Sequence, residues 1–360
     1  MQQKTLLSNI LRLIYCNLYR FTKTYSYQNI AKWRKVKGRY KGKRCWLIAN
    51  GPSLNMTPLY LLKDEYTIMF NRAGLMIERL DYIPSFYMIT DGVVGRNIKD
   101  EITYYVNNCE HVFVPDINKG ELVKFREFVP FRDNVLYMYE EPKKFSHFLP
   151  FMNVGGTVIY AAFQVLMYLG FDEVIVVGND MNYVVHKTVD VLKEEKHGKG
   201  VYQNIRSQKD DDPNHFDPRY FGKGKEYHQP TEVIMRKMLK SLDRVAEEYE
   251  KAGIRVVNAG YNSQVKSFHK LDFYEALGYS LDKIDGLFDD LLKSKGVESK
   301  EWLLRKAVLK DDVWDEELDV VSVPMEMATI IVKKKVLDYL PLGPYMDRVY
   351  FINRKFNTND

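Results

Sequence analysis

The stretch CWLIANGPSLNMTPLYLLKDEYTIMFNRAG, from Cys45 to Gly74, contains the first repeat of the predicted fold. Its apolar start, CWLIAN, predicts a buried strand, and the turn-forming residues NGPS follow at once. NMTPLYLLKD then predicts a helix that begins at Asn55 or Thr57, and YTIMFN predicts a second strand. Strand, turn, helix and strand in this order are typical of a parallel sheet.

The same alternation continues along the chain. FYMITD, HVFVPD, EVIVVGND and IRVVNAG are further short apolar runs that predict strands. Residues 155–170 (GGTVIYAAFQVLMYLG) predict a buried helix that ends at Gly170, and residues 231–253 predict a long amphipathic helix that ends at Gly253. The expected fold class is α/β, with a Rossmann-like, open, mostly parallel sheet and helices on both faces.

Three segments are expected. Residues 45–272 form the Rossmann-like body, and residues 1–44 precede it as a basic amphipathic arm. Residues 273–360 combine acidic helices with the β-branched run ATIIVKKKVL and predict a small, mainly helical C-terminal subdomain. The three cysteines are too few and too scattered for a disulfide framework, which indicates a reducing compartment.

The arm differs from the body in charge. Residues 1–44 contain 12 Lys or Arg and no Asp or Glu, so the net charge of +5 combines an arm of +12 with an acidic remainder of −7. Leucines and isoleucines recur at helical spacing between Leu6 and Leu18, without reaching the length of a membrane span. This pattern predicts an amphipathic helix on an anionic membrane surface. The alternative is a helix packed on the protein's own body; nucleic acid is not expected, because no recognition motif accompanies the charge.

Polar residues end the predicted strands. In an open α/β sheet, ligands bind beyond the carboxyl ends of the strands, so these side chains are expected to surround one crevice. Gly51 is expected to let the backbone approach a ligand, while Ser53 or Asn55 caps a helix whose amides attract phosphate. The alternative is that they only form turns. The strand-end residues are Asn50, Asn71, Asp91 and Asp180.

A second segment, DDDPNHFDPRYFGKGKEYHQPT (residues 210–231), is a long connection without an apolar period. Such connections are often active-site loops. His215 or His228 is a candidate general base, the alternative being a structural role in the loop. Lys223, with Lys225 and Arg219, is a candidate partner of a phosphate. Adjacent carboxylates on a loop are more often solvated than metal-bound, so no metal ligands are predicted.

These motifs resemble a known family. GPSL, FNR, TDG, residues 155–180, NHFDPRYFGKGKEYH and VVNAG look like a bacterial family named after the archaeal 6-hydroxymethylpterin diphosphokinase. Its members often lie in capsule or lipopolysaccharide clusters, and it is similar to the motility-accessory proteins that glycosylate flagellin. The resemblance runs from about Cys45 to Leu271.

The same segment is more distantly similar to the glycosyltransferase family 42 sialyltransferases. That family binds CMP-sialic acid without a metal and uses a histidine base, with tyrosines that assist the leaving phosphate. Here the position of its His-Tyr pair holds Arg219 and Tyr220, with His215 four residues before Arg219. The resemblance implies that Tyr220 assists the leaving group. It implies donor-binding roles for Asn50, Gly51, Pro52, Ser53, Asn71, Gly155, Gly156, Thr157 and Asp180.

The sequence therefore predicts a glycosyltransferase that uses a nucleotide-activated sugar, with a CMP-linked nonulosonic-type acid favoured, to build a bacterial surface glycan. No further cofactor is expected, and the acceptor is expected to be lipid-linked or a glycan. The expected location is the inner face of the cytoplasmic membrane, and the oligomeric state stays open. Two alternatives are a Mg-dependent diphosphokinase, with Asp91, Asp180 and Asp210 as ligands, and a non-catalytic nucleotide-binding assembly factor.

Overall fold

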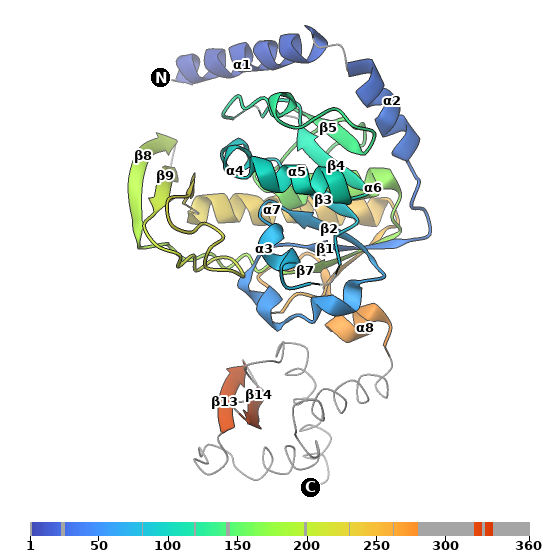
Figure 1. Cartoon of the computed structure of the whole chain (residues 1–360), viewed down its shortest axis with the longest axis vertical. Coiled ribbons are helices and arrows are strands. Elements are labelled where there is room, and N and C mark those ends of the chain that lie inside the picture. Colours follow the sequence, from blue (N-terminus) through green and yellow to red (C-terminus); the bar gives the residue numbers. More distant parts are fainter. Residues whose placement is uncertain are drawn as a thin grey trace.

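The computed structural model of the chain is built on one large sheet (Figure 1). It describes residues 2–22, 26–80, 82–118, 120–141, 145–197, 200–229, 231–261, 263–279, 320–325 and 328–333. Nine strands lie in the order β12-β11-β7-β1-β2-β3-β4-β5-β6, and each neighbouring pair is parallel. The predicted Rossmann-like α/β fold is confirmed. The strands are β1 (Arg44–Ile48), β2 (Tyr66–Phe70), β3 (Phe86–Met88), β4 (His111–Pro115), β5 (Val135–Glu140), β6 (Phe151–Met152), β7 (Glu173–Val177), β11 (Arg255–Asn258) and β12 (His269–Lys270).

Helices cover both faces of the sheet, because side chains of each strand alternate between two apolar cores. In β1, Trp46 belongs to one core and Leu47 to the other. The first core includes side chains of α3 (Gly74–Ile77), α4 (Gly92–Asn97), α5 (Lys99–Asn108) and α8 (Phe273–Leu277). The second includes side chains of α2 (Ser26–Val36), α6 (Val158–Leu169) and α7 (Glu232–Lys251).

The two longest predicted helices of the body are confirmed, with their caps. Thr157 is the N-cap of α6 and accepts a hydrogen bond from the Ile159 amide, and Gly170 ends the helix in the left-handed conformation (φ 90°). Thr231 caps α7 in the same way. Because α6 starts directly beyond the sheet edge, its N-terminus lies at the carboxyl ends of the strands.

The helix predicted over residues 55–64 is wrong. Two short 3₁₀ helices, Pro52–Met56 and Leu59–Leu62, occupy this segment instead. Pro58 separates them, because a proline has no amide hydrogen to continue a helical ladder. The residue before the first of these helices, Gly51, makes no side-chain cap. The turn after β1 therefore does not lead into an α-helix whose amides bind phosphate.

The N-terminal segment forms two helices, α1 (Gln2–Thr22) and α2, and α2 is part of the body. Trp33 is fully buried, and its indole nitrogen donates to the carbonyl of Tyr137 in β5 (3.0 Å). Asn29 donates to the same carbonyl (2.9 Å) and accepts from the Tyr137 amide (2.9 Å), so it satisfies backbone groups of β5 as a neighbouring strand would. The expected boundary at residue 44 is corrected: residues 26–43 lie against the sheet.

A three-stranded antiparallel sheet stands beside the large one and was not predicted. It contains β8 (Val189–His197), β9 (Gly200–Ser207) and β10 (Glu226–His228), in the order β10-β9-β8. β8 is rich in charged residues and β9 in polar ones, so the apolar runs that predict a buried strand are missing. A short 3₁₀ helix, Phe125–Glu127, precedes β5.

The expectation of a mainly helical subdomain over residues 273–360 is tested only in part. Beyond α8, the described residues form the antiparallel pair β13 (Val320–Met325) and β14 (Ala328–Lys333). The β-branched run ATIIV thus lies in a strand, in agreement with β propensity. Residues 280–319 and 334–360 lie outside the described residues. No helix in the described part of the chain has the length and apolarity needed to cross a membrane.

Candidate functional site

A cavity of about 640 Å³ opens at the carboxyl edge of the large sheet. This volume is in the range of small-molecule binding sites. The edge is the topological switch point, because the chain runs from β1 to β2 on one side and returns to β7 on the other. Residues 49–51 after β1, Asn71 after β2 and residues 178–183 after β7 line it, and residues 214–215, 220–221 and 227–229 of the long connection form a further wall.

The structure brings most of the predicted site residues together. Several predicted residues do not line the cavity, Arg219 and Lys225 among them. Ser53 is buried beneath the turn, Pro52 begins the 3₁₀ helix, and Gly155 packs against Tyr160. Lys223 is exposed on the loop, so the predicted phosphate contact of Lys223 is not supported. The predicted residues that do line the cavity are Asn50, Gly51, Asn71, Asp91, Gly156, Thr157, Asp180, His215, Tyr220 and His228.

Gly51 is required for a different reason from the one predicted. A Cβ at this position would lie 2.5 Å from the carboxyl carbon of Asp180 and 2.6 Å from the carbonyl oxygen of Gly178. Asp180 in turn accepts hydrogen bonds from the amide (2.9 Å) and the hydroxyl of Ser53. Gly51 therefore lets the turn after β1 pack on the end of β7. Burial raises the pKa of Asp180, although the bonds from Ser53 act in the opposite direction.

His215 forms a hydrogen bond and a ring stack within the wall of the cavity. Its Nδ1 lies 2.8 Å from Oδ2 of Asp212, and its ring is parallel to that of Tyr220, with centroids 3.9 Å apart. Asp212 is buried and also accepts from the amides of Asn214 (2.8 Å) and Phe221 (3.0 Å). With Nδ1 bonded to a carboxylate, Nε2 is the nitrogen that is open to a ligand. Such an arrangement suits a general base.

The electrostatics of Asp212 favour its charged form. Burial opposes ionisation, but the interactions with His215 and with two backbone amides outweigh it, and the pKa of Asp212 is lowered. Burial also raises the pKa of the Tyr220 hydroxyl, so this group stays protonated and available as a donor. The imidazole of His215 therefore has the Asp212 carboxylate beside it and the neutral Tyr220 phenol stacked on it.

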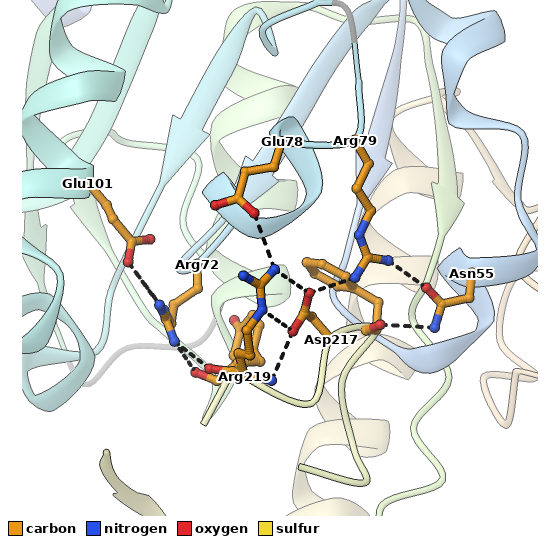
Figure 2. A network of polar contacts seen from close by, with 9 residues as sticks. Asn55, Arg72, Glu78, Arg79, Glu101, Asp217 and Arg219 are labelled. Atoms are coloured by element: carbon orange, nitrogen blue, oxygen red, sulfur yellow. Dashed lines mark hydrogen bonds and ion pairs between the residues drawn. The ribbon is translucent and has the colours of Figure 1, made fainter. Parts of the chain in front are cut away.

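A second network holds this loop against the body (Figure 2). Arg72, which follows β2, donates to the carbonyls of Arg219 (2.6 Å) and Tyr220 (2.8 Å) and pairs with Glu101 (3.2 Å). Asp217 accepts from Arg79 (2.6 Å) and from the guanidinium of Arg219 (2.9 and 3.0 Å). These bonds, with that of Arg219 first, lower the pKa of Asp217. The predicted phosphate role of Arg219 is thus not supported, because its guanidinium points to Asp217 and Glu78.

The segment after β4 forms a further wall. Asn118 donates to the carbonyl of Thr90 (3.0 Å) and accepts from the Glu121 amide (2.8 Å), and Glu121 lies 3.6 Å from Nε2 of His228. Asp91 caps α4 by accepting from the Val94 amide (2.9 Å), and burial raises the pKa of its carboxyl group. His228 is half exposed and faces a carboxylate of the cavity wall, so both predicted histidines reach the site.

Three buried polar atoms of residues that line the cavity have no hydrogen-bond partner among the described residues. They are Oδ1 of Asn71, Nδ2 of Asn179 and Oε1 of Gln229. Buried polar groups are nearly always paired, so this concentration indicates a polar ligand that supplies both donors and acceptors. Lys237 of α7 is the one lysine or arginine among the described lining residues.

No cluster of three or more His, Cys, Asp or Glu side chains within the described ranges is placed to hold a metal ion. The acids named for the alternative function are separated. Asp91 and Asp180 line the cavity, whereas Asp210 is exposed outside it and accepts from the Lys223 amide (2.7 Å). That the reaction needs no metal stays a prediction.

The fold and the cavity define a Rossmann-like α/β protein with a polar ligand site at the switch point. Residues 20–186 match the model of a family described as 6-hydroxymethylpterin diphosphokinase MptE-like. The resemblance predicted from the motifs is confirmed over this range. The match begins inside α1 and ends after β7, whereas the motifs placed it between Cys45 and Leu271.

Comparisons with individual proteins give less information about function than the family match. No curated protein matches the chain. Two solved chains match, and one of them is a MAf glycosyltransferase from Magnetospirillum magneticum AMB-1. It is 15% identical, with a TM-score of 0.41, and the match covers 78% of this chain and 45% of that one. The chain thus spans less than half the length of that protein. No comparison tests the similarity to the family 42 sialyltransferases.

Several residues of the site were not predicted. Asp212 was grouped with its neighbours as a solvated acid, and only the fold shows that it is buried against His215. Asn118 and Glu121 follow β4, whose end PD was noted without a role, and Asn179 precedes the predicted Asp180. The position of each one directly after a strand was a usable signal. Gln229 and Lys237 carry no such signal.

Proposed function

We propose that this protein is a glycosyltransferase that takes a nucleotide-activated sugar, with a CMP-linked nonulosonic-type acid as the favoured donor. The observation that carries the proposal is the His215–Asp212 pair at the cavity, with Nε2 of His215 unoccupied by any described residue. A histidine oriented by a buried carboxylate is suited to remove a proton from an acceptor hydroxyl. The predicted resemblance to metal-independent sialyltransferases supports this assignment.

The reaction is a displacement at the anomeric carbon. The acceptor oxygen loses its proton to Nε2 of His215 and forms the new bond to that carbon, while the bond to the nucleotide phosphate breaks. The leaving phosphate takes the electron pair of that bond. The Tyr220 hydroxyl is a donor for this oxygen, because it is buried and protonated. Lys237 and the N-terminus of α6 add positive potential to the cavity.

The cavity also fits the polar parts of such a donor. The unpaired oxygens of Asn71 and Gln229 accept hydrogen bonds, and Nδ2 of Asn179 donates one. A nucleoside and a sugar acid carry hydroxyl, amine and carbonyl groups that satisfy both types. The basic N-terminal segment supports a position at an anionic membrane surface, so we place the protein on the inner face of the cytoplasmic membrane, building a surface glycan on a lipid-linked or glycan acceptor.

A diphosphokinase is the second candidate, and the family match over residues 20–186 favours it. That reaction transfers a diphosphate from ATP to an alcohol, releases AMP and requires Mg²⁺. Asp91 and Asp180 at the cavity are the acids that would hold the ion, and one lining lysine offers little charge for a triphosphate. A third reading, a nucleotide-binding assembly factor without turnover, predicts binding but no product.

The test begins with thermal-shift screening of the full chain against CMP, UDP, GDP and ATP, with and without Mg²⁺. A ligand that binds only the folded state raises the melting temperature. Release of CMP from CMP-sialic acid, with water or an added glycan as acceptor, is then measured by chromatography. His215→Ala should abolish the release, while His269→Ala, at an exposed histidine of β12, should leave it unchanged. AMP formation from ATP would instead support the diphosphokinase.

A further inference from the structure

Helix α1 has its polarity reversed relative to a normal surface helix. A helix on a globular body usually buries its apolar side chains and exposes its charges. Here Arg20 is 1% exposed, whereas Leu18 is 59% exposed and Phe21 is 68% exposed. Ile10, Leu11 and Ile14 are also exposed. Among the described side chains of α1, the body therefore receives a charge, and the solvent receives the large apolar groups.

The exposed apolar residues share one side of the helix. At about 100° per residue, they fall within an arc of about 100°, and the buried Cys16 and Arg20 lie roughly opposite. We name this set the outer face; it comprises Ile10, Leu11, Ile14, Leu18 and Phe21. Figure 1 shows α1 outside the layers of sheet and helices. The outer face is on the side of α1 that is exposed, whereas Cys16 and Arg20 are buried.

Specific contacts hold α1 in this orientation. Nε of Arg20 lies 3.2 Å from the fully buried carboxylate of Asp116, and its guanidinium lies over the Tyr139 ring, 4.3 Å from the centroid. Arg12 donates to the carbonyl of Gly120 (2.5 Å). A rotation of the helix that buried the outer face would break the Arg20 pair and leave a buried carboxylate with less compensation. The exposed apolar face is thus fixed by the fold.

The contacts of α1 are also contacts of the cavity wall. The segment that begins at Asp116 continues through Asn118, Gly120 and Glu121, and these last three line the cavity. Arg12 bonds Gly120 directly. A surface that binds the outer face of α1 would therefore lie close to the segment that lines the cavity.

We infer that the outer face binds the surface of an anionic lipid membrane. The charge of the segment selects this occupant: residues 1–44 have 12 basic residues and no acidic one, and of the basic residues Arg20 pairs with Asp116 and Arg44 with Glu65 of the body. Arg34 and Lys35 of α2 are exposed. Apolar side chains on one face with basic residues around them insert into the headgroup boundary and attract anionic lipid. The further step, that the acceptor reaches the cavity from this surface, depends on the proposed function.

Vesicle flotation with the full-length protein tests the inference. The probes are vesicles of phosphatidylcholine alone and vesicles that also contain phosphatidylglycerol. We expect binding only to the second kind, weakened by salt. Leu18→Ser combined with Phe21→Ser should reduce binding at least about tenfold, or about 1.4 kcal/mol. Ile83→Ser, at a partly exposed isoleucine far along the chain, is the matched control and should bind like the parent.

The outcomes separate the two proposals. Both variants change exposed side chains, so their melting temperatures should match the parent, and nucleotide binding should be unchanged. Equal vesicle binding by the parent and the double variant would overturn the membrane inference. Self-association of the parent that the double variant loses, without vesicle binding, would assign the outer face to a second copy and overturn it too. Loss of activity in His215→Ala with intact vesicle binding tests the chemistry alone.

Discussion

Replacing Asp217 by Asn should loosen the loop that carries His215 and Tyr220. Asp217 accepts two bonds from the Arg219 side chain, one from the Arg219 amide (2.9 Å) and one from Arg79. Hydrogen bonds to charged groups contribute about 1.5–3 kcal/mol each when buried. Arg79 and Arg219 are 41% and 50% exposed, so solvent screening reduces this sum. We expect a loss of about 2–3 kcal/mol in the free energy of unfolding, and about 3–6 °C in melting temperature.

The assay is urea denaturation of the parent and the variant from about pH 7 to about pH 3.5. The folded-state pKa of Asp217 is depressed, so its contribution is fully present above the unfolded value of about 3.9 and is lost as the pH falls below it. The difference between the parent and Asp217→Asn should therefore shrink at the acidic end. The control is Glu78→Gln, because the Glu78 side chain is 60% exposed and makes one ion pair with Arg219. A variant as stable as this control, or a difference that stays constant with pH, would refute the reasoning.

Four further outcomes are expected. Asp212→Asn should lower turnover about tenfold to a hundredfold, because His215 loses its charged partner, and CMP binding in a thermal-shift assay should persist. Gly51→Val should destabilise the fold by several kcal/mol in urea denaturation; the sequence alone predicts a folded protein that only loses the ligand. Chelation by EDTA should leave CMP release intact, and a loss that Mg²⁺ restores would favour the diphosphokinase. Deleting residues 1–40 should yield insoluble protein, because the deletion removes the buried Trp33; a soluble, folded product would show that α2 is dispensable.

The sheet was predictable because its strands are short apolar runs closed by Asn, Asp or Gly. That pattern identifies β1, β2, β3, β4, β7 and β11. It fails for β8 and β9, whose charged and polar side chains include no continuous apolar run. The separate prediction of a helix over residues 55–64 is wrong because Pro58 interrupts the helical ladder. Charge counting also misplaced the arm boundary, because net charge does not reveal that Trp33 and Asn29 face β5.

The site was predictable where it depends on strand ends, and Asn50, Asn71, Asp91 and Asp180 do meet at one cavity. Roles that depend on the conformation of a long loop were not predictable. The pairing of His215 with Asp212 and of Arg219 with Asp217 involves neighbours on a loop whose backbone the sequence does not define. The sequence alone therefore did not show which of several acidic loop residues pairs with His215 or with Arg219.

The burial of Arg20 against Asp116 has a consequence for the distance between the cavity mouth and a lipid surface. Parting a buried ion pair costs about 3–5 kcal/mol, so α1 does not swing on a flexible hinge. With α1 lying flat on a bilayer, the body keeps one tilt, and the mouth of the cavity stays at one height above the lipid plane. The enzyme would then select acceptors by the distance between the lipid surface and the acceptor sugar. A sugar on a short lipid linker and the same sugar at the end of a long glycan would not be equivalent substrates, even with identical terminal chemistry.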